Sequence, residues 1–142
     1  MPETSLMVDF TALEHNVREI RRILGGTEIM AVLKGNAYGL GARHVMLELL
    51  DLGVKNFAAA NFHEAMDLRF TDCEASVMIL GYVDPENMAE AARNGLSFTV
   101  FSRDYWALLQ SRVDQPFGAH IKVDTGFNRL GFELCGDDCD CV

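Results

Sequence analysis

The sequence lacks the features that mark membrane-spanning, secreted and nucleic-acid-binding proteins. No apolar run reaches the roughly 20 residues that a bilayer-spanning helix needs, and the first ten residues lack the basic and then apolar pattern of a secretory signal. Acidic residues outnumber basic ones by 21 to 12, the formal net charge is -9, and no Lys/Arg cluster offsets it. Because nucleic acids and anionic membranes are polyanions, we expect neither as a partner. We predict a small-molecule ligand and a cytoplasmic location.

Cysteine is too sparse and too unevenly placed for a disulfide framework. The chain has four cysteines, and three of them, Cys135, Cys139 and Cys141, lie in its last eight residues. We interpret all four as thiols. Three thiols without a fourth ligand are weak support for a metal site, so no metal is predicted.

The hydrophobic pattern predicts one α/β domain without an internal boundary. Short apolar runs predict strands at 29–33, 57–60, 77–80, 98–101 and 120–123, and helical periodicity predicts helices at 42–52, 63–70, 85–93 and 103–111. Strand starts recur about every 20 to 28 residues, which is the length of one βα unit, and two-residue hairpin signals are nearly absent. Both observations favour a parallel sheet.

The clearest helix lies near the N-terminus. Thr11 and Glu14 have the spacing of a capping box, Gly25 is placed to end the helix, and one face is apolar through Leu13, Val17, Ile20 and Leu24. Before this helix, residues 5–9 are predicted to form a short strand.

Two architectures fit this alternation. A doubly wound five-stranded parallel sheet is complete at this length, whereas a closed barrel of eight βα units needs roughly 250 residues and leaves this chain with about five of them. Periodicity alone favours the doubly wound sheet, but the motifs favour the barrel.

The first motif, MAVLKGNAYGLGA at 30–42, is an apolar strand that ends on Lys34 and enters a glycine-rich loop. A lysine at the carboxyl end of a parallel strand faces the edge where α/β proteins bind ligands, and desolvation there favours the neutral amine that attacks an aldehyde. The three loop glycines allow the backbone to wrap a ligand, and Tyr38 adds a hydroxyl that can reach a phosphate. The alternative is a lysine that merely extends into solvent.

The second motif, HIKVDTGFNRLGF at 120–132, is another strand that enters a glycine-containing loop. Arg129 is the only cation in the loop, and its planar guanidinium suits a carboxylate or a phenolate oxygen. The alternative for Arg129 is an ion pair with Asp124 or Glu133. Lys122, in the middle of the apolar strand, must face the barrel interior or lie at a sheet edge, and an interior lysine needs a partner.

These two segments, with VDFTALEHNV at the start and VMILGY in the middle, resemble the bacterial alanine racemases from about Val8 to Phe132. The resemblance implies a partial (β/α)8 TIM-type barrel that binds pyridoxal 5'-phosphate (PLP). It implies that Lys34 carries PLP as an internal aldimine and acts as base on one face of the substrate. Tyr38 then bonds the phosphate, and Leu80 packs beside the cofactor. Arg129 bonds the phenolic oxygen and the substrate carboxylate, and it is held in place by Lys122, which matches a lysine that is often carbamylated in the family.

The chain departs from the usual family pattern at three peripheral positions. Gly35 stands where alanine is common, Leu40 where histidine is common, and Phe127 where methionine is common. Of these, Phe127 is the one expected to alter the fit of a substrate side chain.

The resemblance also implies what the whole enzyme does. Residues 1–142 are expected to be the N-terminal part of the barrel domain, without the C-terminal β domain that supplies a second catalytic group across a homodimer interface. The full-length enzyme interconverts L- and D-alanine for peptidoglycan synthesis, and the chain alone is expected to be inactive. Two other functions stay open. One is a non-racemase PLP-binding barrel, for cofactor homeostasis or decarboxylation, and the other is a non-catalytic truncated remnant.

Overall fold

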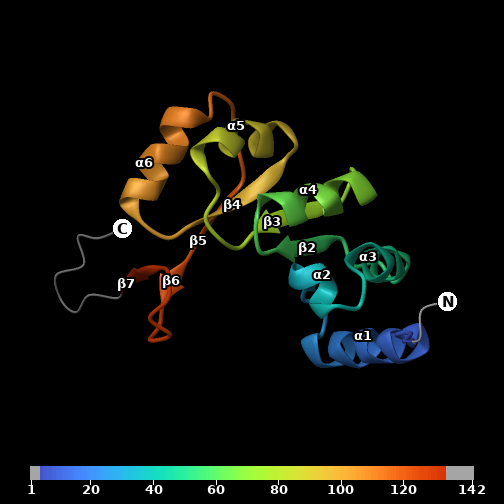
Figure 1. Ribbon diagram of the computed structural model, residues 1–142. Helices are drawn as coiled ribbons and strands as arrows, with labels where there is room; N and C mark the ends of the chain where they lie inside the picture. The colour runs from blue at the N-terminus through green and yellow to red at the C-terminus, as the bar shows by residue number, and fades with distance from the viewer. Residues whose placement is uncertain (1–3, 134–142) are drawn as a thin grey trace.

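The computed structural model describes residues 4–133, and the three cysteines of the tail lie outside this range. Helices and strands alternate along the chain (Figure 1). The helices are α1 (Phe10–Leu24), α2 (Lys34–Tyr38), α3 (Ala42–Asp51), α4 (Phe62–Thr71), α5 (Pro85–Arg93) and α6 (Arg103–Arg112). The strands are β1 (Met30–Val32), β2 (Asn56–Ala59), β3 (Ser76–Ile79), β4 (Leu96–Val100), β5 (Ala119–Ile121), β6 (Val123–Asp124) and β7 (Phe132–Glu133).

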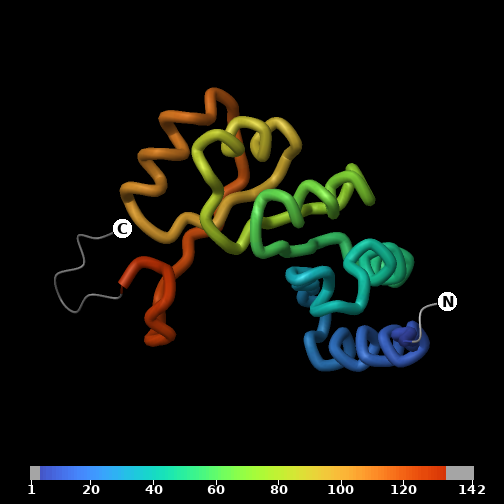
Figure 2. The backbone as a smooth tube through the Cα atoms, viewed as in Figure 1, coloured from blue at the N-terminus to red at the C-terminus, as the bar shows by residue number. Residues whose placement is uncertain are grey.

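Five strands form one parallel sheet in the order β1-β2-β3-β4-β5. The five strands predicted from the apolar runs are therefore confirmed, with bounds shifted by a few residues. A doubly wound sheet reverses its strand order at a switch point. The strand order contains no such reversal within residues 4–133, and the backbone winds in one direction from strand to strand (Figure 2). The doubly wound alternative is therefore wrong, and the fold is part of a βα barrel.

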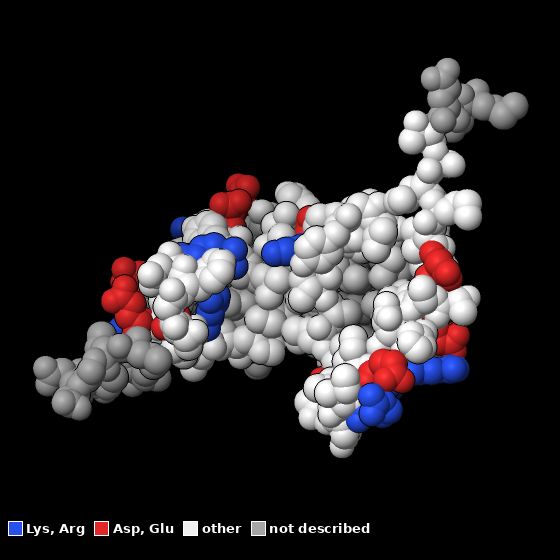
Figure 3. Space-filling view, turned by 90° about the horizontal axis from the view of Figure 1, so that it is seen from below, with Lys and Arg blue, Asp and Glu red and all other residues white. Residues whose placement is uncertain are grey.

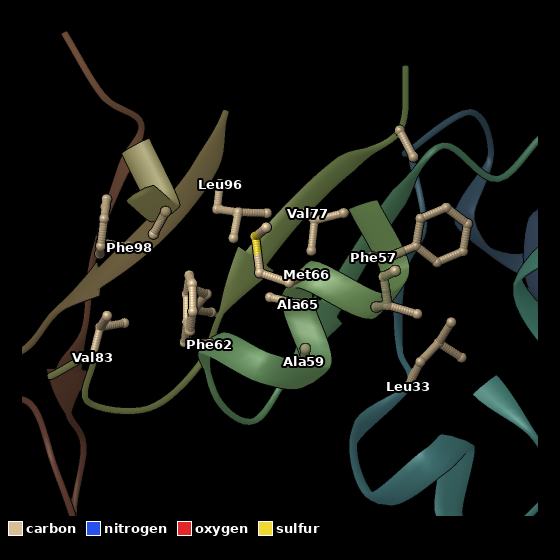
Figure 4. Packing of buried hydrophobic residues seen from close by; sticks show 14 of the residues in the cluster. Leu33, Phe57, Ala59, Phe62, Ala65, Met66, Val77, Val83, Leu96 and Phe98 are labelled. Carbon is tan, nitrogen blue, oxygen red and sulfur yellow. The ribbon is translucent and has the colours of Figure 1, made fainter. Parts of the chain in front are cut away.

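The hydrophobic core lies between the sheet and the helices that cover its outer side. Alternate residues of the strands point to this side, because side chains along a strand face the two surfaces in turn. Figure 4 shows Met66 of α4 packed between Val77 of β3 and Leu96 of β4. The largest fully buried side chains include Phe57, Phe98, Met46, Ile79, Met88 and Leu109.

The helix starts and ends follow local sequence signals. Asn61 and Ser102 are the N-cap residues of α4 and α6, and each side chain accepts the backbone N–H three residues further on. Pro85 occupies the first turn of α5, as its fixed φ favours. Gly25 ends α1 in the left-handed conformation, with φ of 60°.

Two details predicted for the N-terminal region are wrong. The N-cap of α1 is Asp9, whose carboxylate accepts the N–H groups of Thr11 and Ala12, so Thr11 and Glu14 form no capping box. Residues 5–9 form no strand and pair with no strand of the described structure. The apolar face of α1 is only partly covered, because Val17 is buried while Ile20 remains 45% exposed.

Two elements were not predicted. The short helix α2 lies inside the glycine-rich loop after β1, and β6 pairs with β7 in a two-stranded sheet after β5. Figure 1 shows both on the same lower side of the main sheet. No helix among the described residues is long and apolar enough to cross a membrane.

Tyr105 provides a test of the packing between α6 and the loop after β3. The side chain is 4% exposed, its ring stacks on Phe101, and its hydroxyl oxygen accepts the N–H of Val83 at 3.1 Å. Tyr105→Phe leaves this N–H buried without an acceptor, so we expect the free energy of unfolding to fall by about 1–3 kcal/mol. Denaturant unfolding of the two proteins measures the difference.

The control for this test is Tyr82→Phe, since Tyr82 is 48% exposed, and a surface change of this kind is expected to stay within about 0.5 kcal/mol.

Burial raises the pKa of Tyr105. The unfolded chain then loses this proton first as pH rises above about 10, so the stability that Tyr105 contributes declines there. Equal unfolding free energies for Tyr105→Phe and Tyr82→Phe would contradict the hydrogen bond assigned between Tyr105 and Val83.

Candidate active site

The loop after β1 makes a left-handed turn. Gly35, Asn36, Ala37 and Tyr38 have φ of 60°, 54°, 53° and 56°, in the region that L-residues other than glycine rarely adopt. The Ala37 N–H donates to the Leu33 carbonyl at 2.8 Å, and the Gly39 N–H donates to Gly35 at 2.9 Å. Three of the four residues are not glycine, at a cost of roughly 1–2 kcal/mol each. Strain of this kind is retained where surrounding contacts enforce it, often at functional sites.

The loop after β5 is held by Asp124. One carboxylate oxygen accepts the N–H of Gly126 at 2.9 Å and that of Asn128 at 3.0 Å. Gly131 lies so close to the start of this loop that a Cβ there would come within 2.6 Å of the Asp124 nitrogen. Only glycine fits at this position because the loop folds back tightly, and the loop carries Arg129 towards the main sheet.

The hydrogen bonds from Asn128 and Gly126 hold the pKa of Asp124 below its usual range, because they stabilise the carboxylate. Arg129 pairs with neither Asp124 nor Glu133 within residues 4–133, so the ion-pair alternative is wrong. The Arg129 guanidinium instead lies over the Phe127 ring, 4.9 Å from its centroid.

A cavity of about 370 Å³ lies where the two loops face each other. It is lined by Lys34, Ala60, Met78, Leu80, Gly81, Thr99, His120, Ile121, Lys122, Arg129 and Leu130. Four residues predicted to form a site are therefore brought together: Lys34, Leu80, Lys122 and Arg129. Tyr38 does not line the cavity and is 68% exposed, with its ring centroid 6.0 Å from the Lys34 Nζ.

The cavity also contains residues that the motifs did not identify. Met78 precedes Leu80 by two positions, and His120 precedes Lys122 by two, so each shares a strand face with a predicted residue. Thr99 is 2% exposed, and its hydroxyl donates to the Ile79 carbonyl at 2.7 Å. Strand alternation alone would have pointed to Met78 and His120, whereas Thr99 is identified only once the strands are paired.

The charge of the cavity is opposite to that of the whole chain. Lys34, Lys122 and Arg129 line it, and none of the described lining residues is acidic, in a chain of net charge -9. Seen from below, Lys and Arg atoms lie beside a recessed and mostly uncharged surface (Figure 3). Such a site suits an anionic ligand with an apolar body. Fold and site define an α/β barrel-type domain with a cationic ligand cavity at the carboxyl ends of its strands.

The chain belongs to the family described as alanine racemase, N-terminal domain, whose model matches residues 8–138. Members of this family are PLP-dependent isomerases. Alanine racemase 2 of Caldanaerobacter subterraneus is 38% identical over 133 residues, which cover 91% of this chain but 34% of the relative. The chain thus spans about a third of the curated relatives that it matches.

Solved structures show the same partial coverage. The biosynthetic alanine racemase of Pseudomonas aeruginosa superimposes with a TM-score of 0.82 and 30% identity, over 89% of this chain and 36% of that protein. A histidine racemase of Leuconostoc mesenteroides gives a TM-score of 0.82 and 28% identity, over 87% of this chain and 34% of that protein. The barrel fold is therefore shared by racemases whose names specify different amino acids.

The loop that carries Arg129 is expected to resist acid. A lowered pKa means that the Asp124 carboxylate stays charged at pH values where free aspartate, with a pKa of about 3.9, is already protonated. The stabilisation is present above the unfolded pKa and is lost as pH falls through the folded one. In an NMR titration, the amide signals of Gly126 and Asn128 should move together below the usual aspartate range. Movement centred at or above that range would contradict this prediction.

Proposed function

We propose that the cavity binds PLP and that Lys34 is its covalent attachment point. The observation that carries the proposal is the presence of Lys34 and Arg129 in one cavity of about 370 Å³. PLP has an aldehyde, a phenolic oxygen and a phosphate around a flat ring. An amine, a guanidinium and a nearby phenol hydroxyl match these groups, and Met78, Leu80 and Ile121 offer apolar contact to the ring.

Each residue then has a distinct task. Lys34 supplies the amine that holds the aldehyde carbon, and in the reaction its Nζ accepts or returns the Cα proton on one face of the substrate. Arg129 bonds the phenolic oxygen and the substrate carboxylate through its planar donors. When bound, PLP supplies electron withdrawal from the substrate Cα, which makes that proton acidic enough for a lysine base.

Three further residues would support these tasks. Leu80 packs beside the cofactor ring, and Lys122, once carbamylated, would accept hydrogen bonds from the Arg129 guanidinium and keep it in place from the neighbouring cavity wall. Tyr38, whose ring centroid lies 6.0 Å from the Lys34 Nζ and which is 68% exposed, would offer its hydroxyl to the phosphate.

We propose that the complete protein is an amino-acid racemase that converts L-alanine to D-alanine for peptidoglycan synthesis. In this proposal, residues 1–142 are the N-terminal part of its PLP-binding barrel, and a homodimer supplies the acid-base group for the opposite face. The 142-residue chain alone binds PLP without racemising. Phe127, exposed beside Arg129, is the residue most able to change the preferred amino acid, so serine and lysine are assayed with alanine.

Covalent labelling tests the attachment. The chain is incubated with PLP, reduced with borohydride and digested, and the modified peptide is identified by mass spectrometry. We expect modification at Lys34 and its loss in Lys34→Ala. The matched control is Lys55→Ala, because Lys55 is exposed just before β2, at the opposite end of the sheet. Labelling in the folded chain that is spread evenly over surface lysines, or that persists in Lys34→Ala, would refute the assignment.

Arg129 is tested in the complete gene product. Arg129→Gln removes the charge but keeps the approximate length, so PLP should still attach at Lys34 while kcat/KM for alanine falls by about 10- to 100-fold, the loss expected for one charge-assisted hydrogen bond. Arg112→Gln changes an arginine in the last turn of α6 and should leave kcat/KM unchanged. If both variants match the wild type, or if the wild type racemises none of the three amino acids, a non-racemase PLP barrel is favoured.

A further inference from the structure

Glu64 lies outside the cavity but connects two of its walls. It occupies the first turn of α4, where Asn61 caps the helix by accepting the Glu64 N–H at 3.0 Å. One carboxylate oxygen of Glu64 accepts the N–H of Gly35 at 3.0 Å, and the other accepts the N–H of Ala60 at 2.9 Å. Gly35 directly follows Lys34, and Ala60 lines the cavity.

In a continued sheet, these two N–H groups would donate hydrogen bonds between β1 and β2. The Leu33 N–H donates to the Ala58 carbonyl at 2.8 Å, which is the last described ladder bond between β1 and β2. In a regular parallel ladder, the Ala60 N–H would next donate to Leu33, and the Gly35 N–H to Ala60. The left-handed turn prevents this, because the Leu33 carbonyl now accepts the N–H of Ala37.

Glu64 therefore replaces the two ladder bonds that β1 loses when it turns at Lys34. Its partners are backbone donors, and bonds from such donors to a carboxylate are shorter and stronger than neutral ones. The connection continues to the next strand. The Ala60 carbonyl accepts the Gly81 N–H at 3.1 Å, and a Cβ at Gly81 would lie 2.7 Å from that oxygen. Three cavity walls, after β1, β2 and β3, are thus joined through one carboxylate and the backbone N–H and carbonyl of Ala60.

We propose that Glu64 is a positioning residue that fixes the direction of Lys34 relative to the cavity. This inference rests on the proposed PLP attachment at Lys34. The Lys34 backbone is held on one side by the β1–β2 ladder and on the other by the Gly35 bond to Glu64. Without the carboxylate, the strained turn has no partner for the Gly35 N–H, and the amine samples directions that do not face the ligand.

Glu64→Gln tests this in the 142-residue chain. An amide has one acceptor oxygen, so one of the two N–H groups loses its partner and faces an NH₂ group instead. We expect the rate of PLP capture at Lys34, trapped with borohydride, to fall by about tenfold or more. At saturating PLP, the visible circular dichroism per bound cofactor should also change, because it reports the orientation of the ring. A residue that affects stability alone would leave that signal unaltered.

Glu86→Gln is the matched control, since Glu86 is an exposed glutamate in the first turn of α5. It makes the same chemical change near a helix N-terminus. Capture rate, dichroism and melting temperature should equal those of the wild type. If Glu64→Gln captures PLP at the wild-type rate with unaltered dichroism, the positioning role is overturned.

Amide hydrogen exchange gives a measurement that needs no PLP. The Gly35 and Ala60 amides should be protected in the wild type and should exchange at least about tenfold faster in Glu64→Gln, while Leu33 is unchanged. If the variant does not fold, the measurement on the wild type decides. The reference amide is that of Gly26, which donates no hydrogen bond in the described structure. The inference is overturned if the Gly35 and Ala60 amides of the wild type exchange as fast as the Gly26 amide. Absence of wild-type labelling at Lys34 would refute the proposed function but leave this measurement interpretable.

Discussion

The parallel ladder that joins five strands in chain order is the constraint on which the site depends. All the strands run in one direction, so their carboxyl ends lie along one edge, and the residues that follow them face each other. Lys34, Leu80 and Arg129 belong to three different βα units and reach the same cavity for this reason. The buried outer face of the sheet, packed against the helices, holds the strands in this register.

The backbone geometry of the two loops also shapes the site. Both motifs leave their strands through turns that contain left-handed residues other than glycine, and in both a carboxylate accepts two backbone N–H groups: Glu64 at the first loop and Asp124 at the second. The two carboxylates act from outside the cavity. The interior therefore keeps its three cations without a described acidic neighbour, which suits an anionic cofactor.

A fold of this kind hosts many chemistries, so the site and not the barrel carries the functional argument. The family relationship is established over residues 8–138, and it identifies the class of cofactor chemistry. The chain spans about a third of its curated relatives. The racemase reaction, the dimer and the choice among amino acids are therefore proposals for the whole protein.

The sequence by itself determined the α/β class, the five strands and the two loops that carry Lys34 and Arg129, because hydrophobic period, caps and glycines act over a few residues. The tertiary structure decided the rest. It rejected the doubly wound order, the strand at 5–9 and the ion pair of Arg129. It also placed His120 and Thr99 in the cavity and showed what Glu64 binds. Those contacts join residues from different βα units, so they exist only once the strands have paired and a polar group has found its partner across the sheet.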